Sequence, residues 1–349
     1  MPQFKKINLP EGGTTLTYST VDNHDIKMDY YLPPATSTGS LPAMIYYHGG
    51  GMTAGSRRSL SFPHWLYAHC QKANYIFISA DYRLVHPTTT ADQIHDAKAL
   101  FTFLTNPNSA FAQALPANTT LDPARIAVSG FSAGAYSARA ACIYATPKPA
   151  ALLSVYGLGG DLLLDHWTEG RPATSIARFV NLDDVPALLA DRTVVSDDLE
   201  EGAPVSRRFA LTVRWELDGT MLDGCLGVPG LGGMLGAVGY GEREGLVPVQ
   251  LRESFLQFFV GADYPPSVFV HGTEDEVVLP RESVYHHRQL REAGVESELF
   301  LVEGGAHGLW EFALQPEDES VVGRDTAKAY DGALAFVDRA FERVGGGVG

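Results

Sequence analysis

Hydrophobic residues follow two alternating patterns in the first half of the chain. Short continuous apolar runs, bounded by glycine, proline or polar residues, are typical of buried strands, whereas apolar residues three and four positions apart are typical of helices. Buried strands are predicted at 43–47, 74–80, 126–128 and 150–156, and a helix at 91–104. This alternation predicts a mostly parallel central sheet with helices on both faces, which is an α/β fold.

The two ends of the chain extend the same sheet. Short alternating segments at 15–18 and 26–32, separated by turn-forming residues, predict a pair of antiparallel edge strands. The later part of the chain predicts two strands, at 267–271 and 298–302, and two helices, at 281–293 and 324–343.

The alternation of strands and helices stops between residues 158 and 264. An unstructured loop of this length is unusual inside a compact domain, so we predict a large inserted helical lid whose glycine-rich run, 224–241, is its mobile part. The alternative is a disordered insert without function, but the segment is rich in leucine, phenylalanine and tryptophan rather than in charge. The predicted domains are a core of residues 1–157 and 265–349 and an inserted lid of residues 158–264.

One stretch combines a strand, a tight turn and a helix. The apolar run 126–128 leads into Gly130-Phe131-Ser132-Ala133-Gly134, and an alanine-rich segment without a helix breaker follows. Glycines on either side of the turn let strand and helix approach closely, so the Ser132 hydroxyl can lie at the helix N-terminus. For the pentapeptide alone the alternative is a chance match in a chain with 36 glycines. The context predicts a nucleophile elbow.

An acid and a base follow two late strands. Asp275 comes shortly after the strand at 267–271, and His307 follows the next strand along the chain. A serine hydroxyl needs a base to take its proton, and the base needs an acid to orient it. The order Ser132, Asp275, His307 is that of α/β-hydrolases. Glu274 and Glu276 flank Asp275 and are expected to be solvated.

Three consecutive glycines follow the strand at 43–47. In His48-Gly49-Gly50-Gly51 the missing side chains let backbone amides approach a substrate oxygen. An acyl-transfer reaction develops an oxyanion that needs such donors. We expect the amides of Gly50, Gly51 and Ala133 to form the oxyanion hole, and we interpret His48 as structural.

Net charge, cysteine content and the length of apolar runs restrict which partners and which cellular compartment the sequence predicts. The net charge of −15 argues against nucleic-acid binding and against attraction to anionic membranes. Cys70, Cys142 and Cys225 are an odd, widely spaced set without a C-x-x-C motif, so neither a disulfide framework nor a zinc site is indicated. No apolar run reaches transmembrane length and no hydrophobic signal segment begins the chain, so we predict a cytoplasmic protein without stable membrane insertion.

No cofactor or metal is predicted. The sequence has no G-x-G-x-x-G after a strand and no P-loop, and the adjacent His286 and His287 lack the spacing of a metal-binding helix face. The predicted partner is a small-molecule, ester-type substrate, and the sequence leaves a homodimer open.

Five motifs together resemble the hormone-sensitive-lipase-like carboxylesterases of the α/β-hydrolase superfamily. They are H-G-G-G at 48–51, D-Y-R-L at 81–84, G-F-S-A-G at 130–134, H-G-T-E-D at 271–275 and G-A-H-G at 305–308. The resemblance covers 40–157 and 265–345. It implies Ser132 as nucleophile, His307 as base, Asp275 as orienting acid, and Gly50, Gly51 and Ala133 as oxyanion donors, with Asp81 and Arg83 as scaffold residues.

The chain departs from this family in ways that bear on specificity. Phe131 stands where the family usually has an acidic residue, and the N-terminal cap of the family is short or absent, while the insert is long. The lid resembles that of fungal-type relatives, some of which serve small-molecule biosynthesis, or secondary metabolism. We expect Met52, Phe131 and Leu309 to contribute to the substrate pocket.

The predicted function is hydrolysis of a carboxylic ester, lactone or thioester of a small, largely apolar substrate through an acyl-enzyme on Ser132. The apolar composition of the lid favours such a substrate, and equally a lid that buries its own apolar face. Fold and triad leave open a lyase or cyclase of polyketide-type biosynthesis that uses the same pocket without an acyl-enzyme. A non-catalytic receptor, as in the gibberellin receptors, is disfavoured because the base is present.

Overall fold

Eight strands form one sheet in the order β1-β2-β4-β3-β5-β6-β7-β8. The computed structural model describes residues 9–34, 38–59, 62–172, 174–199, 206–309 and 321–345. The strands are β1 (Thr14–Val21), β2 (His24–Tyr31), β3 (Gly39–Tyr47), β4 (Ile76–Ala80), β5 (Thr119–Phe131), β6 (Ala151–Val155), β7 (Ser267–Gly272) and β8 (Ser297–Val302). β1 and β2, and β2 and β4, pair antiparallel, and the other neighbours are parallel. The predicted mostly parallel sheet with an antiparallel edge is confirmed.

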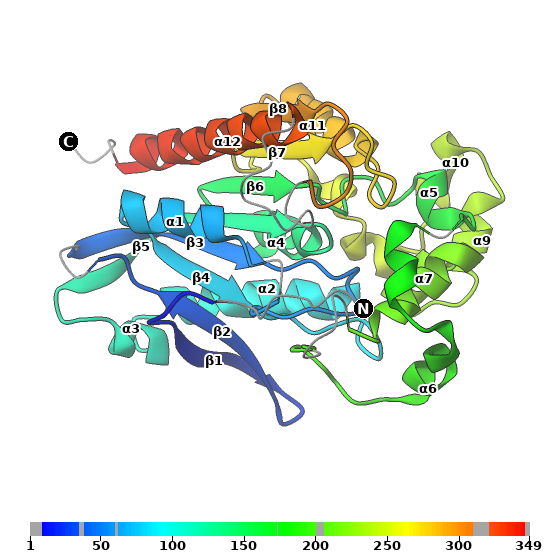
Figure 1. Ribbon diagram of the computed structural model, residues 1–349, viewed down its shortest axis with the longest axis horizontal. Helices are drawn as coiled ribbons and strands as arrows, with labels where there is room; N and C mark the ends of the chain where they lie inside the picture. The colour runs from blue at the N-terminus through cyan, green and yellow to red at the C-terminus, as the bar shows by residue number, and fades with distance from the viewer. Residues whose placement is uncertain are drawn as a thin grey trace.

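Helices cover both faces of this sheet (Figure 1). They are α1 (His64–Ala73), α2 (Thr90–Thr105), α3 (Ala110–Ala114), α4 (Gly134–Tyr144), α11 (Arg281–Glu292) and α12 (Val321–Gly345). Side chains of β3 alternate between two hydrophobic clusters. Ile45 and Tyr47 pack with residues of α2 and α4, whereas Met44 and Tyr46 pack with residues of α1 and α12. Burial on both faces explains why this strand is a continuous apolar run in the sequence.

The hydrophobic pattern does not predict α1 or α3. In α1 only Leu66 and Cys70 are buried, so its apolar stripe is a single i, i+4 pair among polar and aromatic residues. α3 has five residues, of which Phe111 is buried. Elements this short carry too few periodic positions to stand out from loop sequence.

The segment 158–264, called the insert from here on, joins β6 to β7. It contains α5 (Asp165–Thr168), α6 (Val185–Ala190), α7 (Phe209–Asp218), α8 (Met221–Leu226), α9 (Leu231–Gly236), α10 (Tyr240–Leu246) and short 3-10 helices such as Val249–Ser254. The glycine-rich run 224–241 spans the end of α8, all of α9 and the start of α10 with the turns between them, and Gly227 and Gly230 are in the left-handed region at helix ends. The insert is therefore helical, and its mobility stays a prediction.

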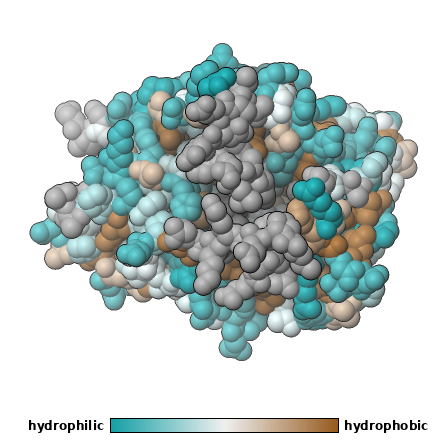
Figure 2. Space-filling model, viewed as in Figure 1, coloured by the Kyte–Doolittle hydropathy of each residue, from teal (hydrophilic) through white to brown (hydrophobic). Residues whose placement is uncertain are grey.

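The parallel strands point toward the insert. In Figure 1 the arrows of β3, β4, β6 and β7 run toward α5, α7, α9 and α10. Figure 2 shows hydrophilic residues around most of the outline and hydrophobic residues on the right, where Figure 1 places these helices. Within the described residues, no helix is long and apolar enough to cross a membrane.

Candidate active site

Ser132 lies in a strained turn between β5 and α4. Its φ is +52°, in the left-handed region that non-glycine residues seldom adopt. A Cβ at position 130 would lie 2.4 Å from Ala135 Cα, and one at position 134 would lie 2.2 Å from Tyr47 O, so both neighbours must be glycine. This local geometry is that of the predicted nucleophile elbow.

The three residues predicted as a triad come together at the carboxyl edge of the sheet. Ser132 Oγ is 2.9 Å from His307 Nε2, and His307 Nδ1 is 2.8 Å from Asp275 Oδ2. The carboxylate accepts the proton of Nδ1, which leaves Nε2 as an acceptor for the serine hydroxyl. Burial alone would raise the pKa of Asp275, but the histidines that contact it hold that pKa well below its usual value. Asp275 is therefore ionised at neutral pH.

His271 is a contact of the acid that sequence reasoning did not assign. Its Nε2 is 3.1 Å from Asp275 Oδ2 and 2.8 Å from Val278 O, so this nitrogen carries the proton. The other carboxylate oxygen of Asp275 accepts the amides of Val277 and Val278, both at 2.9 Å. The signal in the sequence was the i, i+4 spacing of His271 and Asp275 across the end of a strand. Asp275 is thus fixed in orientation by donors on both of its oxygens.

The carbonyls of Gly49 and Gly50 are held by hydrogen bonds within the core. Gly49 O is 2.7 Å from His48 Nδ1, and Gly50 O accepts the amides of Thr53 and Ala54 at 3.2 and 3.0 Å. In a trans peptide the N–H points opposite to the C=O, so these bonds also set the directions of the Gly50 and Gly51 amides. A Cβ on Gly49 would lie 3.2 Å from Ser132 Cβ, which places the run directly beside the nucleophile.

His48 lies in the core beneath this run. It is fully buried, its ring stacks on Tyr82 at a centroid distance of 4.5 Å, and burial lowers its pKa to about 4. The neutral ring donates from Nδ1 to Gly49 O. The position of His48 agrees with a structural residue rather than with an acid or base of the reaction.

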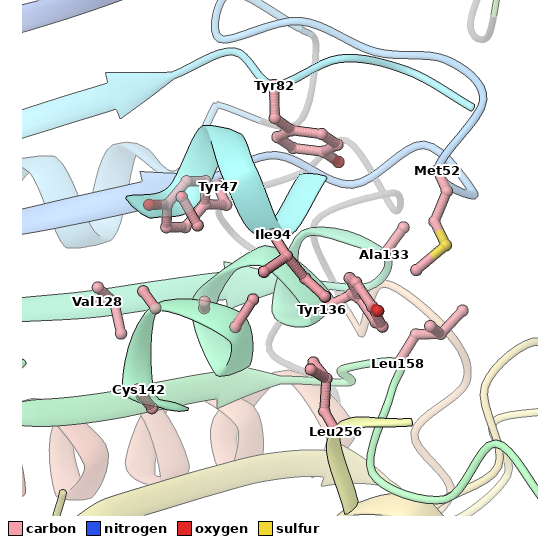
Figure 3. Packing of buried hydrophobic residues seen from close by; sticks show 14 of the residues in the cluster. Tyr47, Met52, Tyr82, Ile94, Val128, Ala133, Tyr136, Cys142, Leu158 and Leu256 are labelled. Atoms are coloured by element: carbon pink, nitrogen blue, oxygen red, sulfur yellow. The ribbon is translucent and has the colours of Figure 1, made fainter. Parts of the chain in front are cut away.

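A narrow apolar cavity lies between the core and the insert. Its lining includes Met52, Leu158 and Trp167 together with residues of α8, and its volume is about 10 Å³. Figure 3 shows Met52, Ala133 and Leu158 near one another at the ends of the strands. Because the amide of Leu158 donates to Ser132 O at 3.0 Å, the cavity is adjacent to the elbow.

Phe131 does not lie with this cavity. Its side chain is buried on the α1 and α12 side of the sheet, with ring centroids 5.1 Å from Tyr46 and 5.9 Å from Trp65. Strand alternation turns Phe131 to the face opposite Val128, so it does not line this cavity, and its contribution to a substrate pocket stays a prediction. Leu309 is also buried in that second cluster, with φ +50°, and does not line the cavity. Of the three predicted pocket residues, Met52 lines it.

The scaffold residues of the D-Y-R-L motif lie in buried ion pairs. Asp81 accepts the Arg57 amide at 2.7 Å and pairs with its guanidinium, while Arg83 bonds Asp96 at 2.8–3.1 Å through two nitrogens. The first pair joins the end of β4 to the loop before α1, and the second joins the loop after β4 to α2, which agrees with a structural role.

The insert contacts the loop that carries the acid. Arg171 donates to Glu276 O at 3.1 Å and to Val277 O at 3.3 Å, and His166 Nε2 is 2.9 Å from Val277 O. Arg171 also pairs with Glu216 of α7 at 2.6 Å, and both side chains are nearly buried. Within the described residues, no group of His, Cys, Asp or Glu could hold a metal ion.

Comparison with known proteins supports the fold. The family model described as BD-FAE matches residues 28–149. The butyrate-bound esterase Est2 of Thermogutta terrifontis superposes with a TM-score of 0.55 at 20% identity, covering 96% of this chain and 95% of that one. The chain shares the fold of this esterase. The fold predicted from the sequence is confirmed, and these similarities support the resemblance to carboxylesterases.

Two curated relatives of this chain differ in length. The chain is 24% identical to the non-reducing polyketide synthase pkbA of Emericella nidulans over 84% of its own length and 13% of the synthase. It is 24% identical to Neutral cholesterol ester hydrolase 1 of Pongo abelii, over 83% of this chain and 72% of that protein. The chain therefore spans about one seventh of the polyketide synthases that it matches, at 13% and 14% of their lengths.

Proposed function

We propose that this chain cleaves a carboxylic ester, lactone or thioester of a small, largely apolar substrate through an acyl-enzyme on Ser132. The observation that carries the proposal is the hydrogen-bonded chain from Ser132 Oγ through His307 to Asp275, with the serine in a left-handed turn. A chance cluster of these residue types would not produce both features.

The mechanism begins with attack of Ser132 Oγ on the substrate carbonyl carbon. His307 Nε2 takes the hydroxyl proton as the new C–O bond forms, and ionised Asp275 stabilises the resulting imidazolium. The carbonyl oxygen becomes an oxyanion, which the amides of Ala133, Gly50 and Gly51 stabilise. Support comes from the carbonyls of Gly49 and Gly50, whose hydrogen bonds turn the following amides to the other side of the chain.

Collapse of this intermediate releases the alcohol or thiol, which takes the proton from His307. Water then attacks the acyl carbon and loses a proton to the same nitrogen. When the second intermediate breaks down, Ser132 Oγ leaves and recovers its proton from His307, and the acid is released. The base thus returns to its starting state in each cycle.

The cavity lining supports an apolar acyl group. Apart from the Thr90 hydroxyl and the Cys225 thiol, its lining residues are hydrophobic, and its volume of about 10 Å³ is close to the room that one water needs. A cavity of this size has no room for an acyl group until the insert moves. The similarity to polyketide synthases favours a thioester or polyketide-type chain as a second candidate, which requires the insert to move.

The test is intact-protein mass after treatment with a fluorophosphonate, together with turnover of p-nitrophenyl acetate. We expect one adduct in the parent protein and none in Ser132→Ala or His307→Ala, with turnover reduced at least about 10³-fold in both. His95→Ala, which changes an exposed histidine, is the matched control and should behave as the parent.

Two outcomes would contradict the acyl-enzyme. No adduct and no turnover in a folded parent protein would remove the esterase proposal. Turnover of a natural substrate that survives Ser132→Ala but not His307→Ala would instead favour the lyase or cyclase alternative, because that chemistry needs only the acid or base.

A further inference from the structure

Helix α7 of the insert lies directly on the glycine run. Phe209, Thr212, Val213 and Glu216, spaced three and four residues apart, are all buried. A Cβ on Gly51 would lie 2.6 Å from Thr212 Oγ1 and 2.9 Å from Phe209 Cε2. Position 51 must therefore be glycine because the insert occupies the space of a side chain, in addition to its φ of +61°.

A chain of two hydroxyls connects this helix to the glycine run. Thr212 Oγ1 donates to Gly51 O at 2.9 Å and lies 2.8 Å from Thr53 Oγ1. A hydroxyl has one proton, so Thr212 gives its proton to the carbonyl and accepts that of Thr53. Thr53 is completely buried and Thr212 is 2% exposed, so water does not compete for these bonds.

The three carbonyls of the glycine run differ in what holds them. Gly49 O is bonded to His48 and Gly50 O to two amides of the core loop, whereas Gly51 O is bonded to Thr212 of the insert. Gly51 O belongs to the Gly51–Met52 peptide, which directly follows the amide of Gly51, so the bond from α7 restrains the chain on the far side of that proposed donor. The insert therefore restrains the same segment that is proposed to supply the oxyanion donors.

We infer that Thr212 is a positioning residue for the oxyanion hole, so that the insert takes part in transition-state stabilisation as well as covering the site. The inference rests on the proposed function. It requires α7 to keep its contact with Gly51 during turnover, which confines any opening of the insert to its other helices.

The position of α7 does not depend on Thr212 alone. Arg208, just before the helix and nearly buried, donates to Thr53 O at 2.9 Å, to Val85 O at 3.1 Å and to His86 O at 2.5 Å. Removal of one hydroxyl from α7 should therefore leave the helix attached. A variant at Thr212 reports on the hydrogen bond rather than on loss of the insert.

The test compares Thr212→Val with Thr212→Ser in steady-state hydrolysis of p-nitrophenyl acetate. Val keeps the shape and removes the donor, whereas Ser keeps the donor. Loss of one oxyanion donor typically costs about 10²–10³ in kcat, and a donor that is only loosened should cost less. We expect kcat of Thr212→Val to fall about tenfold with KM within about twofold, and Thr212→Ser to recover most of it.

Thr168→Val is the matched control, because Thr168 is a buried threonine of the insert whose hydroxyl contacts Asp165 O at 3.5 Å and not the glycine run. It should retain the parent kcat. Unchanged kcat in Thr212→Val, a rise in KM alone, or failure of Thr212→Ser to restore activity would overturn the inference while leaving the esterase proposal standing. A parent protein without adduct or turnover would overturn both.

Discussion

The core and the insert contact the residues of the candidate active site through different kinds of atoms. In the core, backbone amides make many of the contacts that hold the site: Asp275 accepts two amides of its own loop and Gly50 O accepts two more, besides the bonds from the His271 and His48 side chains. In the insert, side chains make the contacts, as in the bonds from Arg171 to Val277 O, from Thr212 to Gly51 O and from Arg208 to Thr53 O. Backbone donors are thus prominent in the core, whereas the contacts from the insert come from side chains.

The two kinds of contact differ in how they tolerate amino-acid substitution. Backbone hydrogen bonds form for almost any residue that tolerates the local conformation, so the core geometry depends on a few glycines, the reacting side chains and two buried histidines, His48 and His271. Contacts made by a side chain are lost when that residue is replaced. The active-site geometry of the core should therefore tolerate substitutions outside its motifs. The contacts between insert and core should be lost when one of a few buried polar residues of the insert is replaced.

The largest effect should come from the acid itself. Asp275→Asn offers an amide N–H₂ to His307, which disfavours the tautomer that accepts the serine proton, so we expect kcat to fall by about 10⁴. Glu276→Gln, at the exposed neighbouring position, should stay close to the parent. Steady-state kinetics on p-nitrophenyl acetate measures both, and a loss below about tenfold in Asp275→Asn would mean that the backbone-held acid is not needed.

A smaller effect on activity, with a large effect on stability, should follow from Arg171→Met in the insert. The change leaves Glu216 buried without its partner, and breaking a buried pair in this way typically destabilises by about 3–5 kcal/mol. Urea unfolding should show this, and the double variant Arg171→Met/Glu216→Leu should recover most of it.

Arg214→Met is the control for this experiment. Arg214 is on the same helix and pairs with Asp218, but both side chains are largely exposed. Its unfolding midpoint should be almost that of the parent. Equal midpoints for Arg171→Met and Arg214→Met would show that the buried pair does not attach the insert.

The smallest expected effect is a difference in thiol reactivity between core and insert. Cys70, Cys142 and Cys225 are free and buried, and burial raises the pKa of Cys142 and of Cys225 to about 12. None should react quickly in the folded protein. Because Cys225 lies in α8 of the insert, we expect it to be labelled first, at a rate set by local opening.

Labelling with iodoacetamide followed by peptide mass mapping measures the order. Equal rates at Cys225 and Cys142 would indicate that the insert opens only when the core unfolds. Fast labelling at all three positions would contradict the burial of these thiols.

The sequence by itself determined the sheet, the nucleophile elbow and the three residues that meet at its edge. Each of these is encoded by neighbours along the chain: apolar runs give strands, Gly130 and Gly134 permit the turn, and parallel strands bring their carboxyl ends to one edge. Strand alternation also carried the correct direction of Phe131, which the sequence interpretation did not use.

Only the tertiary structure decided how the insert meets the core. Arg171 and Val277, or Thr212 and Gly51, are far apart in sequence, and nothing in the neighbourhood of either residue specifies the other. A buried polar side chain must find a partner, but which one it finds depends on how several short helices pack together. Adjacent residues determine local backbone geometry, whereas these pairs of distant residues come together only once the chain has folded.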